Sequence, residues 1–157
     1  MSELKTYIIY DPVVQNEVAQ PVIETIKAME NVTVIPFEKS AKTFPGAIDN
    51  ADALVIVMGK VTKTKSSKVR PQLEYAVNTT KPIIGVNVNG MRAQDTEALP
   101  TLLKNRGLLV VNSLPEAIQK ALKEWPAKYD AEKFATAKGT FRLTNEFYDA
   151  LEQESDE

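Results

Sequence analysis

The amino-acid sequence predicts an α/β fold, in which five parallel strands form an open sheet with helices on both faces. Two patterns support this prediction. Short apolar runs rich in β-branched residues recur along the chain, and the segments between them carry apolar residues at helical spacing. Such alternation of strands and helices is typical of a parallel sheet that is covered by helices. The expected strands are residues 7–10, 32–37, 53–58, 82–88 and 108–111.

The first expected helix lies between the first two strands and carries one apolar stripe, which predicts a single buried face. Pro21 lies inside this stripe and lacks the N–H group that a helix interior uses, so the helix is either kinked at Pro21 or begins close to it. The residues of the stripe are Val14, Val18, Val22, Ile26 and Met29.

The segments on either side of the third strand predict two further helices. Residues 39–50 are rich in Lys, Ser, Pro and Gly, which indicates a loop and a short helix. After the third strand, Ser67 can act as the N-cap of a helix in which Pro71 is tolerated near the first turn. The residues expected to pack inward are Ala47, Ile48 and Ala51 in the short helix, and Val69, Leu73, Ala76 and Val77 in the longer one.

The last expected helix begins at a capping box. Ser113 and Glu116 have the spacing at which each side chain bonds the backbone N–H group of the other. We expect this helix to end at Pro126. Its inward-facing residues are expected to be Ile118, Ala121, Leu122 and Trp125.

The chain of 157 residues is long enough for one ordinary core without metals or disulfides. We expect residues 1–129 to form the α/β domain and residues 130–157 to form a C-terminal extension. The extension contains apolar anchors that predict that it folds back onto the domain, and an acidic end that predicts disorder. The anchors are Phe134, Phe141, Phe147, Tyr148 and Leu151.

Composition excludes several classes of chemistry. The chain contains no cysteine and no histidine. Disulfides, thiolate zinc sites, cysteine nucleophiles and histidine general bases are therefore absent, and we expect no metal site. Any catalysis must rely on carboxylates, Lys, Tyr or the backbone. A net charge of −2 gives no reason to expect DNA as a partner. Glu3 stands where a secretory signal is basic, and no apolar run approaches a membrane span, so we expect a cytoplasmic protein with no membrane partner.

Candidate ligand-binding residues follow from the expected sheet, because ligands of open α/β sheets bind beyond the carboxyl ends of the strands. The chain has no G-x-G-x-x-G or P-loop pattern. A basic segment between Lys60 and Arg70 can hold a pyrophosphate or can be a solvated surface. The candidates after each strand are Tyr10 and Asp11, residues 37–42, residues 59–67 and residues 87–91.

Residues 51–86 resemble a known family. A strand ending in Met58-Gly59 is followed by Ser66-Ser67-Lys68-Val69 and by Lys81-Pro82-Ile83-Ile84-Gly85-Val86. This order resembles the TIR-like domains of bacterial antiphage defence, in particular the signalling subunit of Thoeris systems. In that family Ser-Lys-Trp-Val precedes Glu-Ile-x-x-Ala and Lys-Pro-Ile-Ile-Gly-Val, and the Glu is catalytic. Counting back from Ala76 and from Lys81 places this Glu at position 72, where the present chain has Gln72.

The resemblance implies a flavodoxin-like, TIR-like fold and NAD as a substrate rather than a permanently bound cofactor. It implies that the enzyme cleaves the nicotinamide–ribose bond and makes an ADP-ribose-derived or cyclic signal for an effector protein, and that the chain forms a homo-oligomer. Gln72 would occupy the catalytic position and disable the reaction. The residues expected to contact the nucleotide are Tyr10, Asp11, Phe37 and Lys39 at the base and ribose, Gly59 beside them, and Ser66, Ser67 and Lys68 at the phosphates.

Several alternatives remain open at the level of sequence. Gln72 can be an engineered replacement of Glu, a natural residue of a member that binds without turnover, or a bystander while Glu74 or Asp11 acts. Glu74 lies about 200° around a helix from residue 72, so it does not share its face. The function can be NAD processing, a non-catalytic nucleotide-binding or oligomerisation module, or a hydrolase similar to nucleoside deoxyribosyltransferases, whose nucleophile would also fall at position 72.

Overall fold

The computed structural model describes residues 3–11, 16–59, 69–88, 103, 107–129, 140–143 and 147–150. Strands and helices alternate along this part of the chain, as the apolar pattern predicts, except that no described helix stands between β4 and β5. The strands are β1 (Leu4–Ile9), β2 (Val32–Ile35), β3 (Ala53–Met58), β4 (Ile83–Asn87), β5 (Leu108–Asn112) and β6 (Thr140–Arg142). The helices are α1 (Asn16–Lys27), α2 (Phe44–Asn50), α4 (Arg70–Val77) and α5 (Pro115–Lys128).

The strands form one parallel sheet in the order β2-β1-β3-β4-β5-β6. The first five strands have the flavodoxin-like order, in which the chain reverses its direction of travel across the sheet between β1 and β3. The predicted α/β class, with helices on both faces, is therefore confirmed. The sequence predicts five strands, and the C-terminal extension adds β6 beside β5. The extension thus folds back onto the domain, whereas its acidic end lies outside the described residues.

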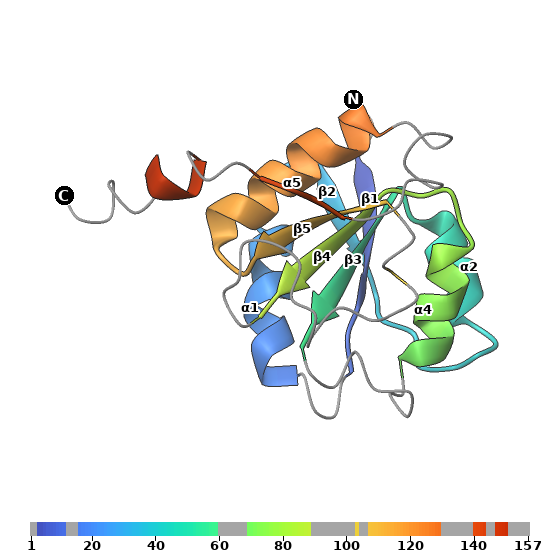
Figure 1. Ribbon diagram of the computed structural model, residues 1–157. Helices are drawn as coiled ribbons and strands as arrows, with labels where there is room; N and C mark the ends of the chain where they lie inside the picture. The colour runs from blue at the N-terminus through green and yellow to red at the C-terminus, as the bar shows by residue number, and fades with distance from the viewer. Residues whose placement is uncertain are drawn as a thin grey trace.

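The helices cover the two faces of the sheet in pairs, with α1 and α5 on one side and α2 and α4 on the other (Figure 1). Each face has its own apolar core. The period of two along β1 assigns Ile8 to the α1/α5 core and Tyr7 and Ile9 to the α2/α4 core. Tyr7 is therefore held on the same side of the sheet as α4.

The buried face of α1 differs from the predicted stripe. Val18 is 43% exposed, while Ala19 and Ile23 are buried beside Val22 and Ile26. Val14 lies outside the described residues. Pro21 is inside the helix rather than at its start, and its carbonyl accepts a hydrogen bond of 2.8 Å from the Thr25 hydroxyl. The helix is rotated relative to the prediction because the buried stripe follows positions 19, 22, 23 and 26, spaced three, one and three apart.

The ends of α5 also differ from the prediction. Leu114, not Ser113, is the N-cap residue, and no side chain caps the helix. The Asn112 Oδ1 atom accepts a hydrogen bond of 3.2 Å from the Leu114 N–H group, a local turn that starts the helix one residue later. At the other end α5 continues through Pro126 to Lys128. Proline is tolerated there because it removes one hydrogen bond in the last turn, where Trp125 stays buried in the core.

The helix α4 begins at Arg70, with Val69 as its N-cap residue and no side-chain cap. The predicted cap, Ser67, lies outside the described residues. The inward positions Val69, Leu73 and Ala76 are buried, as predicted. In the short helix α2 the buried residues are Phe44 and Ile48, so Phe44 joins the expected Ile48 as an anchor. None of the helices in the described ranges combines the length and the apolar character needed to cross a membrane.

Candidate functional site

The candidate site lies at the carboxyl edge of the sheet. In an open α/β sheet of this strand order, ligands bind where the strand order reverses, outside the carboxyl ends of β1 and its neighbours. Three segments meet here, namely β1, the residues that follow β2, and α4, which packs on the adjacent face. These three segments supply Tyr7, Glu38 and Gln72, which the fold brings into direct contact.

Gln72 is only 3% exposed, although a glutamine side chain normally lies in solvent. Its Oε1 atom lies 2.7 Å from the Tyr7 hydroxyl, and its Nε2 atom lies 2.9 Å from the Glu38 carbonyl oxygen. The Glu38 N–H group donates to the Tyr7 hydroxyl oxygen at 3.2 Å. Both ends of the buried amide are therefore bonded to protein atoms.

The Tyr7 hydroxyl keeps its proton over the whole physiological range of pH. Burial raises the pKa of this group from 10.0 to about 12, while the hydrogen bond from the Glu38 backbone lowers it. The neutral hydroxyl therefore donates to Gln72 at 2.7 Å, accepts from the Glu38 N–H group, and lies 3.3 Å from the Glu38 carbonyl oxygen, a longer second contact for the same proton.

Two predicted site residues, Tyr10 and Phe37, are in contact. Their ring centroids lie 4.8 Å apart with a tilted geometry, and the Phe37 ring also stacks on Tyr7 at 6.1 Å. Tyr10 and Phe37 help to line a cavity of about 210 Å³ between α1 and the β1–β2 pair. The remaining lining residues are Ile8, Gln20, Ile23, Lys27, Val34, Ile35 and Pro36. Gln72 does not line this cavity; it touches Tyr7, on which Phe37 rests.

The other predicted site residues are placed differently. Asp11 follows β1 and is only 4% exposed, so it is a buried acid at the carboxyl edge. Lys39 follows Glu38 and is exposed, and Gly59 follows β3. Ser66, Ser67 and Lys68 lie outside the described residues. Of the predicted residues, Gln72 and Phe37 both contact Tyr7, and Tyr10 contacts Phe37.

Glu74 does not share the position of Gln72. It is exposed on the opposite side of α4, where its carboxylate pairs with Arg70 at 3.0 Å. This agrees with the angular separation expected from the sequence. Glu74 is thus a surface acid and takes no part in the buried cluster.

The roles of Tyr7 and of the Glu38 backbone are not predicted by any motif in the sequence. Tyr7 stands in an apolar run that predicts only a strand, and contacts of main-chain atoms leave no signature in side-chain patterns. The available signal was the alternation of side chains along a strand. Residues 7 and 9 of β1 face the same side of the sheet, toward α4.

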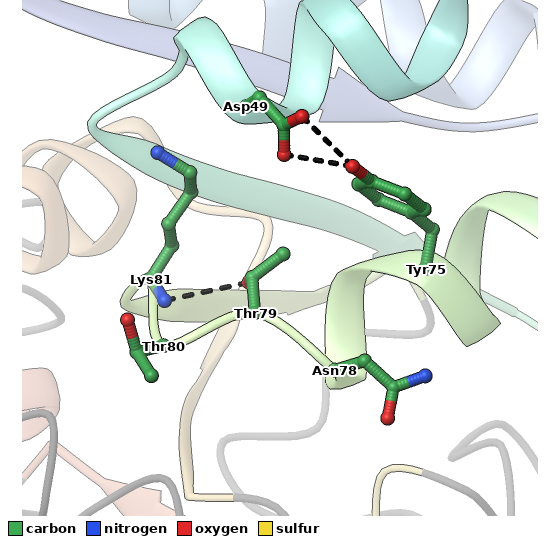
Figure 2. A pocket seen from close by; sticks show the side chains of 6 residues that line it. All are labelled: Asp49, Tyr75, Asn78, Thr79, Thr80 and Lys81. Carbon is green, nitrogen blue, oxygen red and sulfur yellow. Dashed lines mark hydrogen bonds between the residues drawn. The ribbon is translucent and has the colours of Figure 1, made fainter.

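A larger cavity, of about 490 Å³, lies at the opposite edge of the sheet (Figure 2). Asp49 of α2 and Tyr75 of α4 face each other there, and the Tyr75 hydroxyl donates to the carboxylate at 2.8 and 2.9 Å. The Lys81 backbone N–H group donates to the Thr79 hydroxyl at 3.4 Å. The Lys81 ammonium group donates to the Ala51 carbonyl oxygen. This cavity adjoins the amino ends of the strands, away from the edge where sheets of this type bind ligands, so we do not place the functional site in it.

Within the described residues, no group of three or more acidic, histidine or cysteine side chains could hold a metal ion. No protein-family model matches the chain, and no curated protein matches it. Among solved structures, the chain is similar to a protein from P. pentosaceus described as NADPH-quinone reductase, with 13% identity, a TM-score of 0.43, and coverage of 83% of this chain and 98% of that chain. The fold assignment rests on the strand order.

Proposed function

We propose that this protein is a TIR-like module that binds NAD or an ADP-ribose-type nucleotide at the carboxyl edge of its sheet and does not cleave it. One observation carries the proposal. At the position of the catalytic Glu in the TIR-like family, the chain has an uncharged amide that is buried and bonded at both ends to the protein. Such a side chain is suited to holding the site together and unsuited to reacting with a ribose.

The chemistry explains why an amide at position 72 silences the reaction. Cleavage of the nicotinamide–ribose bond develops positive charge on the ribose, and the transition state is stabilised by a nearby carboxylate. A carboxylate about 4 Å away at an effective dielectric near 20 is worth roughly 4 kcal/mol, or about a thousandfold in rate. Gln72 keeps the shape of Glu and lacks its charge.

The aromatic pair Tyr10 and Phe37 supports binding of a planar base. Stacking on an aromatic side chain is worth about 1–3 kcal/mol per base. The cavity of about 210 Å³ is smaller than the 300–1,000 Å³ typical of pockets for drug-sized ligands. It is therefore suited to one ring of a nucleotide, with the ribose and phosphates outside it.

Asp11 is the acid to test as a substitute for the missing carboxylate. It follows β1 at the same edge of the sheet and is nearly buried. Glu74 lies on the exposed side of α4 and pairs with Arg70. If the chain retains any turnover, Asp11→Asn is the variant that should remove it.

A direct experiment compares binding with cleavage. NAD and ADP-ribose are titrated calorimetrically into the full chain, and free nicotinamide is followed by chromatography. We expect heat of binding and no nicotinamide release from the native chain. Release by the native chain would contradict the proposal, and the absence of binding by both nucleotides would favour an interaction module that works by assembly.

A latent NAD-cleaving site is a second candidate, favoured by the coincidence of Gln72 with the family's catalytic position. Gln72→Glu then releases nicotinamide while the native chain does not. Gln119→Glu on α5 makes the same chemical change on the other face of the sheet and serves as the matched control. Cleavage of free nucleosides without cleavage of NAD by the Gln72→Glu variant would instead support the deoxyribosyltransferase-like reaction.

The partners in this proposal follow from the resemblance. NAD or an ADP-ribose-type nucleotide is the ligand, and the chain assembles with copies of itself. An effector protein that responds to a signal belongs only to the second candidate, in which NAD is cleaved. Light scattering after gel filtration, with and without nucleotide, measures that assembly.

A further inference from the structure

The side chains of Gln72 and Tyr7 and the backbone N–H and C=O groups of Glu38 form a closed ring of hydrogen bonds. The Glu38 carbonyl oxygen can only accept, so it is the amide nitrogen of Gln72 that faces it, at 2.9 Å. The Gln72 oxygen must then face Tyr7, which donates to it at 2.7 Å. The Glu38 N–H group donates to the Tyr7 oxygen at 3.2 Å and completes the ring. Each of the three members both donates and accepts.

The ring joins parts of the chain that are far apart in sequence. Tyr7 lies in β1, Glu38 follows β2, and Gln72 lies in α4, with separations of 31, 34 and 65 residues. Hydrogen bonds in such a partly buried, closed arrangement polarise one another and fix a single geometry. The backbone at position 38 is therefore held by both of its polar groups.

The ring also determines where the aromatic pair lies. Phe37 directly precedes Glu38, and its ring stacks on Tyr7 and contacts Tyr10. Fixing the Glu38 peptide limits the backbone that carries the Phe37 side chain. The hydrogen-bonded ring and the wall of the candidate base site thus share Tyr7 and the Phe37–Glu38 peptide.

Only a side chain with one donor and one acceptor on the same carbon closes this ring. A carboxylate at position 72 has two acceptors, and one of them would face the Glu38 carbonyl oxygen, also an acceptor. A methionine has the length of glutamine but offers neither a donor nor a strong acceptor. We propose that Gln72 is a positioning residue whose amide holds the segment after β2, and through it Phe37, in the geometry that the nucleotide requires. The nucleotide in this inference comes from the proposed function, whereas the role of Gln72 in holding the Glu38 backbone does not depend on that function.

The test measures local order and binding separately. Hydrogen exchange of the Glu38 amide is followed in the native chain and in Gln72→Glu and Gln72→Met, with Gln119→Glu as the matched control. We expect exchange at Glu38 to accelerate at least tenfold in both residue-72 variants and to stay unchanged in the control. The amides of β4 report global stability and should keep their protection. Affinity for ADP-ribose should fall about tenfold in the same two variants.

The outcomes separate the two proposals. Unchanged exchange at Glu38 in both residue-72 variants overturns the positioning role, even if nucleotides bind. Faster exchange at Glu38 in a chain that binds no nucleotide supports the ring and overturns the proposed function. Equal loss of protection at Glu38 and throughout β4 shows a general structural role and also overturns the inference. If the residue-72 variants do not fold, Tyr7→Phe, which keeps the aromatic ring, carries the same measurement.

Discussion

Removal of the Tyr7 hydroxyl tests the buried cluster through the stability of the whole domain. In Tyr7→Phe the ring still packs between β1 and α4, but the Gln72 oxygen loses its donor at 2.7 Å and the Glu38 N–H group loses its acceptor at 3.2 Å. A buried polar group without a partner costs about 1–3 kcal/mol. Water can reach half-buried Glu38, so the Gln72 oxygen takes most of the penalty. We expect the free energy of unfolding at pH 7 to fall by about 1–3 kcal/mol.

The same substitution has a signature in the dependence of stability on pH. Burial raises the pKa of Tyr7 from 10.0 to about 12. Because the folded-state pKa is higher than the unfolded value, the stabilisation is complete below pH 10 and is lost between pH 10 and pH 12. By pH 11, halfway through this window, the native chain should have lost about 1.4 kcal/mol from this group alone. Phe lacks the titration, so the stability difference between the two proteins should narrow by that amount.

Urea unfolding at pH 7 and at pH 11 measures the loss of stability and its dependence on pH. It is followed by the fluorescence of Trp125, the one tryptophan of the chain. The matched control is Tyr75→Phe, which removes an exposed hydroxyl bonded to Asp49 and should leave the stability at pH 7 close to that of the native chain. A stability difference between native and Tyr7→Phe proteins that is the same at pH 8 and pH 11 would refute the argument. Equal stability of the two proteins at pH 7 would refute it as well.

Three further outcomes are expected. A Cβ atom at Gly85 would lie 2.7 Å from the Met58 Cε atom, so Gly85→Ala should cost about 1–3 kcal/mol in urea unfolding; no measurable cost would mean that Met58 moves aside freely. Phe37→Ala should weaken ADP-ribose binding at least fivefold in calorimetry, since stacking is worth about 1–3 kcal/mol per base, and an unchanged affinity would place the base elsewhere. Val18→Ser should change the free energy of unfolding by less than about 0.5 kcal/mol, whereas Ile23→Ala, at a buried position outside the predicted stripe, should cost about 2–5 kcal/mol, and the reverse order would support the face of α1 that the sequence predicts.

The fold could be predicted because its strands carry their own signal. A strand buried on both faces, such as Ala53–Met58, is a continuous apolar run bounded by polar residues, and its position in the sequence is unambiguous. The helices are predicted less accurately, since valine at position 18 satisfies the helical period as well as alanine at position 19 does. Packing of α1 against β2 and α5 determines which of the two is buried, and that information is not local in the sequence.

The ends of the helices were harder to predict than their existence. Ser113 has the spacing of a capping residue, but the Asn112 side chain bonds the Leu114 N–H group first and moves the start of α5 by one position. Competing side chains of this kind differ by about 1 kcal/mol or less, so sequence patterns cannot rank them.

The candidate site was predicted only in part. The position after a strand identified Tyr10 and Phe37, and the resemblance identified residue 72. The contact of Gln72 with Tyr7 and with the Glu38 main chain depends on how α4 lies against β1, a relation between residues 65 positions apart. That relation also shows what a motif comparison omits, namely that the amide at position 72 is held by partners on both of its sides.

The pairing of β6 with β5 gives the C-terminal extension a structural role at the edge of the sheet. Leu108, Val110 and Val111 of β5 are fully shielded from solvent, and Phe141 of β6 packs against Trp125 at 5.3 Å. A chain cut after residue 129 would present β5 as a flat, apolar edge with open backbone groups, the kind of strand that recruits other chains and aggregates. The three residues of β6 close that edge with a strand too short to serve as a template itself. The described part of the extension therefore covers the β5 edge to which another chain could otherwise add a strand.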